Sequence, residues 1–201
     1  MIGAMKRFLP LCVFAGSVLS LSAHPAQFHA SDANGAVSAG FLHPFTGLDH
    51  LVVMVSVGLW AVQIGGRALW LLPTAFVSSM LAGGIIGLSG FRTPIAEHGI
   101  IASIFLFGAA LGIAWRPRLS VAVLFTALAG LCHGYAHGSE MPSGLLPLLY
   151  LCGMIAATGI LHAVGIGGGL GLKRSGTPLL LRASGVAVLL FAVYDAVFPV
   201  A

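Results

Sequence analysis

The sequence predicts an all-α membrane protein, in which a cleavable signal peptide precedes a bundle of six transmembrane helices. Hydrophobic residues make up 58% of the 201 residues and charged residues only 7%, whereas soluble domains carry roughly 25% charged residues. Apolar stretches long enough to cross a bilayer recur along the chain, and glycine and proline separate them. Because the few basic residues are spread over short connections, we expect no nucleic-acid partner.

The first 23 residues have the pattern of a secretory signal peptide. Lys6-Arg7 form a basic start, an apolar core follows over residues 8–21, and a small-residue cleavage site ends at Ala23. We expect a periplasmic N-terminal tail over residues 24–40 and the transmembrane domain over residues 41–201. An uncleaved first helix is the alternative, although the apolar core is short for a span.

Six apolar stretches of the mature chain have membrane-spanning length. They lie near residues 41–62, 68–88, 99–115, 119–138, 145–164 and 179–197. One side of the resulting topology holds only Arg92, and the other holds Arg67, Arg116, Arg118, Lys173, Arg174 and Arg182. Because basic connections stay in the cytoplasm, this bias places both mature termini on the periplasmic side of a bacterial inner membrane.

Glycines four residues apart predict close contact between helices. The pattern occurs in the second, third and fourth stretches, at Gly83 and Gly87, at Gly108 and Gly112, and at Gly130, Gly134 and Gly138. Small residues at this spacing let two helix backbones approach each other in a membrane. We therefore expect a tightly packed bundle.

The first stretch carries a carboxylate and two imidazoles, which are costly inside a bilayer. An Asp at a helix centre costs about 2.5–3.5 kcal/mol on the insertion scale, so such groups are usually functional. In a continuous helix, His43 and His50 share one face, and Met54 extends that face by one turn. Asp49 could bind an ion directly or orient an imidazole. Imidazoles together with a carboxylate indicate a divalent transition metal.

A second group of polar residues ends the fourth stretch. His133 and His137 are four residues apart, a helical spacing that can hold a single ion, and Glu140 follows one turn later. Both groups fall on the outer half of the predicted bundle. The sequence therefore predicts a metal site that faces the periplasm.

Five further residues are weaker candidates for the metal path. His24 and His29 fall in the expected tail, where a solvated arm is the ordinary alternative. Glu97 and His98 open the third stretch and could simply mark the membrane surface. His162 lies deep in the fifth stretch, in the cytoplasmic half, where a hydrogen bond to a backbone carbonyl would also explain it.

The sequence resembles the HupE/UreJ family of bacterial nickel permeases and accessory membrane proteins. The resemblance rests on His43-Pro44-x2-Gly47-x-Asp49-His50 and on His133-Gly134-x-Ala136-His137-Gly138-x-Glu140, and a signal peptide followed by six helices also matches. It implies that Ni²⁺, or Co²⁺, moves inward to supply the proteins that mature hydrogenase or urease. It also implies a metal path through His43, Asp49, His50, His133, His137 and Glu140, and no enzymatic activity.

Three other classes of function are also compatible with these residues. Gly87-Leu88-Ser89-Gly90 matches a short string of rhomboid-like intramembrane proteases. Histidines from two helices, such as His50 and His133, could instead bind haem. A membrane metal sensor or metallocentre-assembly protein, without transport of its own, would use the same metal ligands as a permease. The sequence leaves energy coupling and oligomeric state undetermined.

Overall fold

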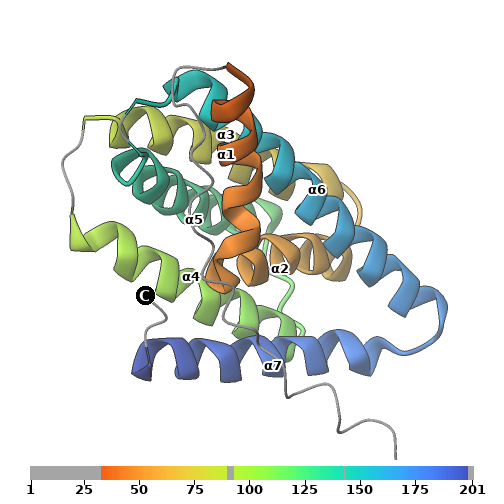
Figure 1. The fold of residues 1–201 in the computed structure, drawn as a ribbon. Helices are drawn as coiled ribbons and strands as arrows, with labels where there is room; N and C mark the ends of the chain where they lie inside the picture. The colour runs from red at the N-terminus through yellow and green to blue at the C-terminus, as the bar shows by residue number, and fades with distance from the viewer. Residues whose placement is uncertain (1–32, 90–92, 143, 199–201) are drawn as a thin grey trace, which may run out of the picture.

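A computed structural model describes residues 33–89, 93–142 and 144–198, which form seven α-helices (Figure 1). The expected signal peptide and the tail up to residue 32 lie outside the described residues. The helices are α1 (Ala33–Thr46), α2 (Leu48–Ile64), α3 (Ala68–Gly87), α4 (Pro94–Gly112), α5 (Leu119–Ser139), α6 (Pro147–Arg174) and α7 (Pro178–Val197).

The all-α membrane class predicted from the sequence is confirmed. In the described part of the chain, the five helices α3 to α7 are each long and apolar enough to cross a membrane. Helices α1 and α2 pass the same test only together, and they are bent by 83° at the residue between them. The bundle therefore has up to six spans, of which the first is broken.

The continuous helix expected over residues 41–62 was wrong. Gly47 between α1 and α2 is extended, with φ of −100° and ψ of 116°. The hydroxyl of Thr46 donates to the His43 carbonyl at 2.8 Å and so closes the last turn of α1. Helical periodicity alone does not reveal this break, because apolar residues continue on both sides of Gly47.

Helix α1 begins at Ala33, earlier than the boundary expected at residue 41. Residues 33–40 are therefore helical and pack against α6. The backbones approach closely at two glycines: a Cβ at Gly40 would overlap the Tyr150 backbone, and one at Gly153 would overlap that of Val37. Close glycine contact of this kind is a known way to hold helices together in a membrane.

Helix α6 extends ten residues beyond the expected end near residue 164. It passes through Gly167, Gly168 and Gly169, which follow the expected end closely. A helical glycine costs roughly 0.5–1 kcal/mol relative to alanine. Packing against α2 offsets this cost, because Gly169 lies against Val62 and the Lys173 ammonium donates to the Val62 carbonyl.

The glycine pairs predicted to bring helices together do so most clearly between α3 and α5, the most extensive helix pair. A Cβ on Gly130, Gly134 or Gly138 would overlap the backbone carbonyl of an α3 residue. On α4, a Cβ at Gly108 would press against Leu189 of α7. These contacts fix the position of α5, which carries one of the histidine pairs.

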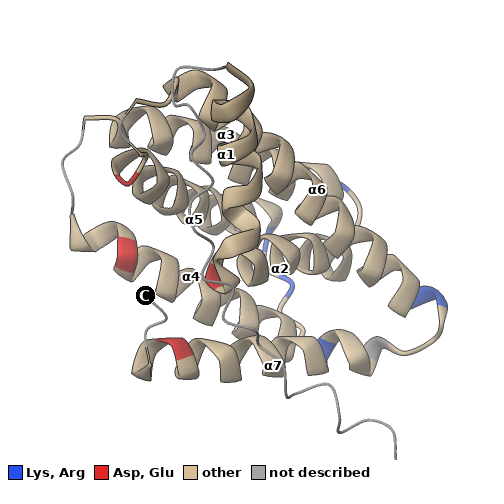
Figure 2. Cartoon of the chain, in the orientation of Figure 1, with Lys and Arg blue, Asp and Glu red and all other residues tan. Residues whose placement is uncertain are grey.

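The described charged residues separate toward opposite ends of the bundle (Figure 2). The carboxylates lie toward the left end in Figure 2, and the basic residues lie toward the middle and right of the view. Helix α6 has Lys173 and Arg174 in its last turn. The bundle therefore has an acidic end and a basic end.

Candidate metal centre

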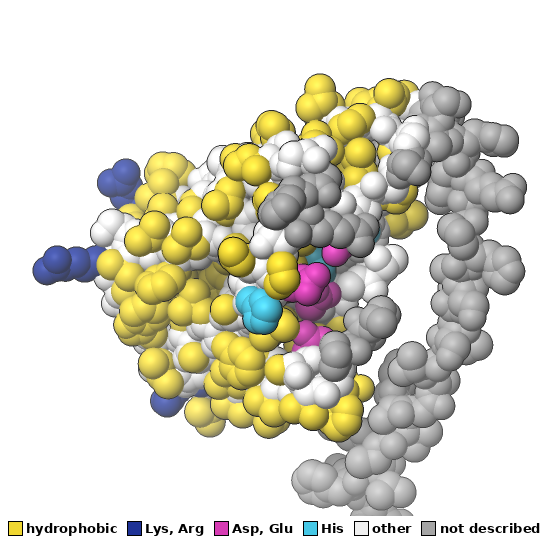
Figure 3. All heavy atoms as spheres, turned by 90° about the vertical axis from the view of Figure 1, so that its left-hand side faces the viewer, with side chains coloured by type: hydrophobic (Ala, Val, Ile, Leu, Met, Phe, Trp, Pro, Cys, Tyr) yellow, Lys and Arg dark blue, Asp and Glu magenta, His cyan; other side chains and the backbone are white. Residues whose placement is uncertain are grey.

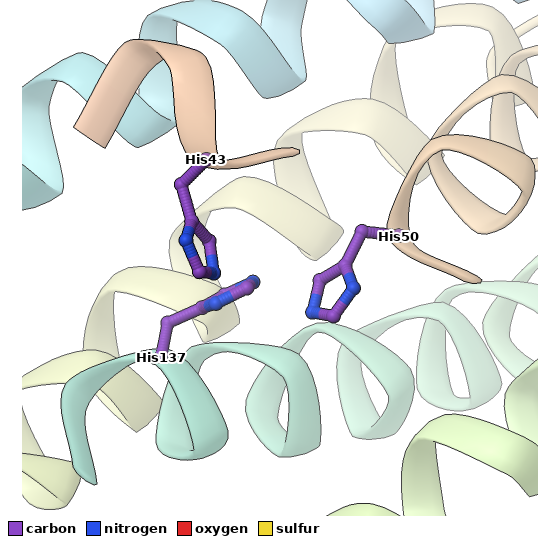
Figure 4. A group of neighbouring side chains, drawn as sticks. All are labelled: His43, His50 and His137. Carbon is purple, nitrogen blue, oxygen red and sulfur yellow. The ribbon is translucent and has the colours of Figure 1, made fainter. Parts of the chain in front are cut away.

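Three imidazoles from three helices meet near the acidic end of the bundle (Figure 4). His43 lies in the last turn of α1, His50 in the first turn of α2 and His137 in the last turn of α5. One nitrogen of each ring lies within 4.8 Å of a nitrogen of both others. The break at Gly47 makes this possible, since it turns α2 so that His50 faces His43.

His137 is at the centre of the group. Its ring centroid is 4.6 Å from that of His43 and 4.3 Å from that of His50, whereas His43 and His50 are 6.0 Å apart. His137 is buried, and neither of its ring nitrogens has a hydrogen-bond partner among the described residues. A buried polar atom without a partner costs about 1–3 kcal/mol, so a ligand that uses these nitrogens is expected.

Neighbouring groups prepare two of the imidazoles to bind a cation. The Nδ1 atom of His50 lies 2.7 Å from a carboxylate oxygen of Asp49, which favours the proton on Nδ1 and leaves the Nε2 lone pair free. His133 Nδ1 donates to the Ala129 carbonyl at 2.9 Å, so its Nε2 also keeps a lone pair. The His133 ring is 5.3 Å from that of His50, which extends the group one layer inward.

The ends of two helices add a favourable potential for a cation. Helices α1 and α5 both end beside the histidine group, and a helix C-terminus carries a partial negative charge. The N-terminus of α2 has the opposite sign, and Asp49 in its first turn offsets it. The two helix C-termini and Asp49 therefore favour a positive ion beside the three imidazoles.

A cavity of about 710 Å³ opens onto this group. Four carboxylates line it, Asp49 of α2, Glu97 of α4, Glu140 after α5 and Asp195 of α7, together with His43 and His50. Glu97 and Glu140 are exposed, whereas His133 and His137 are buried. Figure 3, which views the acidic end, shows carboxylates and histidines between hydrophobic side chains. The arrangement leads from exposed carboxylates to buried imidazoles.

The weaker sequence candidates fall in different places. Glu97 lines the cavity. His98 is exposed and donates to the Pro94 carbonyl at 2.6 Å, outside the histidine group. His162 is buried away from the group, in contact with Phe76. His24 and His29 lie outside the described residues.

Sequence reasoning counted Asp195 among the carboxylates of the outer half but did not include it in the site. It lies in the last turns of α7, far along the chain from both motifs, and reaches the cavity because α7 packs against α4 and α2. The signal that could have identified Asp195 is its position as a carboxylate within an apolar helix. Nothing in the sequence indicates which helix lies next to α7.

A family comparison agrees with the motifs that form this centre. The sequence model described as "HupE / UreJ protein" matches residues 12–194. The chain belongs to the HupE/UreJ family. It is also 38% identical over 154 residues to "Protein HupE" of Rhizobium leguminosarum bv. viciae, an alignment that covers 75% of this chain and 80% of that protein. No solved structure matches the chain.

In this HupE/UreJ protein, the geometry argues against two of the rival functions. Ser89 of the protease-like string is exposed in the turn after α3, and it does not line the cavity beside the histidines. The His50 and His133 rings are 5.3 Å apart and lie edge to face. A haem between them would have to displace the rings of His137 and Phe76, which lie 4.3 Å from His50 and 5.5 Å from His133 between centroids.

Even the small substitution Gly47→Ala should impair the metal centre of this family member. A Cβ at this position would lie 2.7 Å from the Asp49 carboxylate and 2.9 Å from His50 Nδ1. We expect Gly47→Ala to separate this pair and to weaken Ni²⁺ binding by about tenfold, with the protein still folded. Equilibrium dialysis of the purified protein tests this, with Gly159→Ala as the control because a Cβ there meets nothing within 4 Å. Equal affinity of the two variants would contradict it.

Proposed function

We propose that this protein carries Ni²⁺, or Co²⁺, inward across the bacterial cytoplasmic membrane. The observation that carries the proposal is the convergence of His43, His50 and His137 at the inner side of a carboxylate-lined cavity. Membership of the HupE/UreJ family supports a role in nickel or cobalt handling. The ion is the cargo of the protein, and its final users are the maturation proteins of hydrogenase or urease.

The path begins at the carboxylates of the cavity. Exposed Glu97 and Glu140, with half-buried Asp195, raise the local concentration of divalent cations at the mouth. The ion then exchanges oxygen ligands for the imidazoles of the central group. Imidazole nitrogen suits late first-row ions such as Ni²⁺, whereas Mg²⁺ and Ca²⁺ keep oxygen ligands, so this exchange selects against the abundant cations.

The central group is open enough to release its ion. Imidazole nitrogens around one transition-metal ion lie about 3 Å apart, given metal–nitrogen bonds of about 2.0–2.1 Å. The nitrogens here all lie within 4.8 Å of one another, so small ring rotations bring them to that spacing. Conduction needs a site of moderate affinity, and a group whose rings adjust to the ion supplies it better than a rigid cage. His133, one layer inward, then offers the next nitrogen.

The charge distribution supports the inward direction. The basic end of the bundle suits the cytoplasm and the acidic, cavity-bearing end suits the periplasm. Both termini of the mature chain then lie in the periplasm, as the sequence predicts. Lipid surrounds the exposed apolar side chains of α3 to α7.

Uptake of radioactive nickel tests the proposal in cells that lack their own high-affinity nickel importers. The intact protein should raise uptake at least about tenfold above the empty cells, and His50→Ala at a matched membrane level should remove the gain. His98→Ala, on the exposed side of α4, is the matched histidine control and should transport normally. No uptake from a correctly inserted protein would favour a sensor or metallocentre-assembly role instead.

A further inference from the structure

A second set of atoms that are able to bind a metal lies in the core, at residues outside the motifs of the central group. Met54 of α2, Met80 of α3 and Thr158 of α6 are all fully buried. The Thr158 hydroxyl lies 3.4 Å from the Met54 sulfur and 3.7 Å from the Met80 sulfur. Three helices thus bring two thioethers and a hydroxyl together.

Thr158 differs from other hydroxyl residues of the bundle in what it contacts. The hydroxyls of Thr74, Ser79, Ser103, Thr126, Ser139 and Ser184 donate to backbone carbonyls three or four residues earlier, as is usual in helices. Thr158 instead points at two sulfurs, which are weak acceptors. Its single proton can satisfy only one of them at a time, so a sulfur lone pair stays available.

His162 lies one helical turn after Thr158 on α6, on the same face. Its side chain is 1% exposed, and neither ring nitrogen has a hydrogen-bond partner among the described residues. The backbone hydrogen bond that would make His162 an ordinary core histidine is therefore missing. A buried imidazole in this state costs about 1–3 kcal/mol unless a ligand uses its nitrogen.

Phe76 connects this inner set to the central group. Its ring centroid is 5.5 Å from that of His133 and 5.2 Å from that of His162. Met80 follows Phe76 by one turn on α3. His162 is 15 residues into α6, or about 22 Å along the helix from its start, and so lies past the middle of a ~30 Å bilayer core.

We propose that His162, the thioethers of Met54 and Met80, and the hydroxyl of Thr158 form a second, inner station for the same late first-row divalent ion. The inference rests on the proposed function, since it gives the ion a place to go after His133. All four donors are neutral, and thioethers bind such ions weakly. The station therefore receives the ion without trapping it, and Phe76 contacts both His162 of the station and His133 of the central group.

The number of nickel ions bound by the purified full-length protein tests the inner station. We expect His162→Phe, which keeps an aromatic ring of similar size, to bind one Ni²⁺ fewer than the unaltered protein in equilibrium dialysis. The affinity of the remaining central site should change by less than about twofold. His98→Phe, which alters an exposed histidine, should bind the full number. An unchanged count in His162→Phe would overturn the proposal.

A second variant keeps the test decisive if His162→Phe does not fold. Met54→Leu combined with Met80→Leu conserves volume and removes both sulfurs, a change that cores usually tolerate. X-ray absorption of the nickel-loaded protein should show sulfur neighbours that this double variant lacks. Nickel without sulfur neighbours in the fully loaded, unaltered protein would contradict the station.

Transport separates this inference from the proposed function. If the unaltered protein transports nickel, His162→Phe should lower the maximum rate by about tenfold with little change in KM, because entry uses the central group. If the unaltered protein transports nothing, the proposed function fails, while the ion count and the sulfur signal still decide the inner station. Normal transport by a folded His162→Phe variant would overturn the inner station and leave the proposed function standing.

Discussion

Replacing His137 with alanine should weaken Ni²⁺ binding at the central group by at least about 100-fold and abolish transport. His137 is the ring that lies against both His43 and His50, at 4.6 and 4.3 Å between centroids. Loss of a group that only orients a ligand costs about 10–100-fold in metal affinity, so loss of the ligand itself should cost at least the upper figure. Equilibrium dialysis of the purified protein with Ni²⁺ measures the effect.

Two further variants make the His137 result specific. His137→Phe fills the space of the buried ring, so it separates loss of the ligand from loss of packing, and it should bind as poorly as His137→Ala. His98→Ala removes a histidine that bonds only to the Pro94 carbonyl among the contacts seen, and it should bind normally. Near-normal affinity in either His137 variant would show that the ion binds elsewhere.

The second large effect concerns packing. Gly134→Val should destabilise the protein by about 3 kcal/mol or more, because the new Cβ would overlap the backbone carbonyl of Met80 and helices cannot yield as a side chain does. Since α5 carries His133 and His137, forcing it away from α3 also disturbs the metal centre. We expect a Tm in detergent that is lower by roughly 5–10 °C.

Gly159→Val provides the matched control for the packing prediction. Gly159 is also a helical glycine, on α6, but a Cβ there meets nothing within 4 Å. The same substitution at this position should leave the Tm within about 2 °C of the unaltered protein. Equal melting of the two variants would mean that the close contact between α3 and α5 does not hold the bundle together.

The membrane class and the main histidine clusters could be predicted because each depends on local sequence. Span length, basic connections and glycine spacing are read within one helix, and so is the spacing of His133 and His137. The sequence left two roles open for Asp49, and the structure places its carboxylate 2.7 Å from His50 Nδ1, the contact that an orienting role needs.

Features that depend on how helices meet could not be predicted in the same way. The bend at Gly47 interrupts an apolar run without a change of composition, because a single glycine in extended conformation is enough. Asp195, Met80 and Thr158 join their sites only through tertiary packing of α7, α3 and α6. The unpaired state of His162 likewise depends on neighbours from other helices.

The most direct test of the central claim is nickel flux into liposomes that contain only this purified protein. With a fluorescent nickel chelator trapped inside and a nickel gradient directed inward, liposomes with the intact protein should fill at least about tenfold faster than liposomes with His137→Ala. Such a result would show that the chain itself conducts the ion through the group of His43, His50 and His137. Equal rates for the intact protein, the variant and empty liposomes would contradict the account and leave a sensing or assembly role.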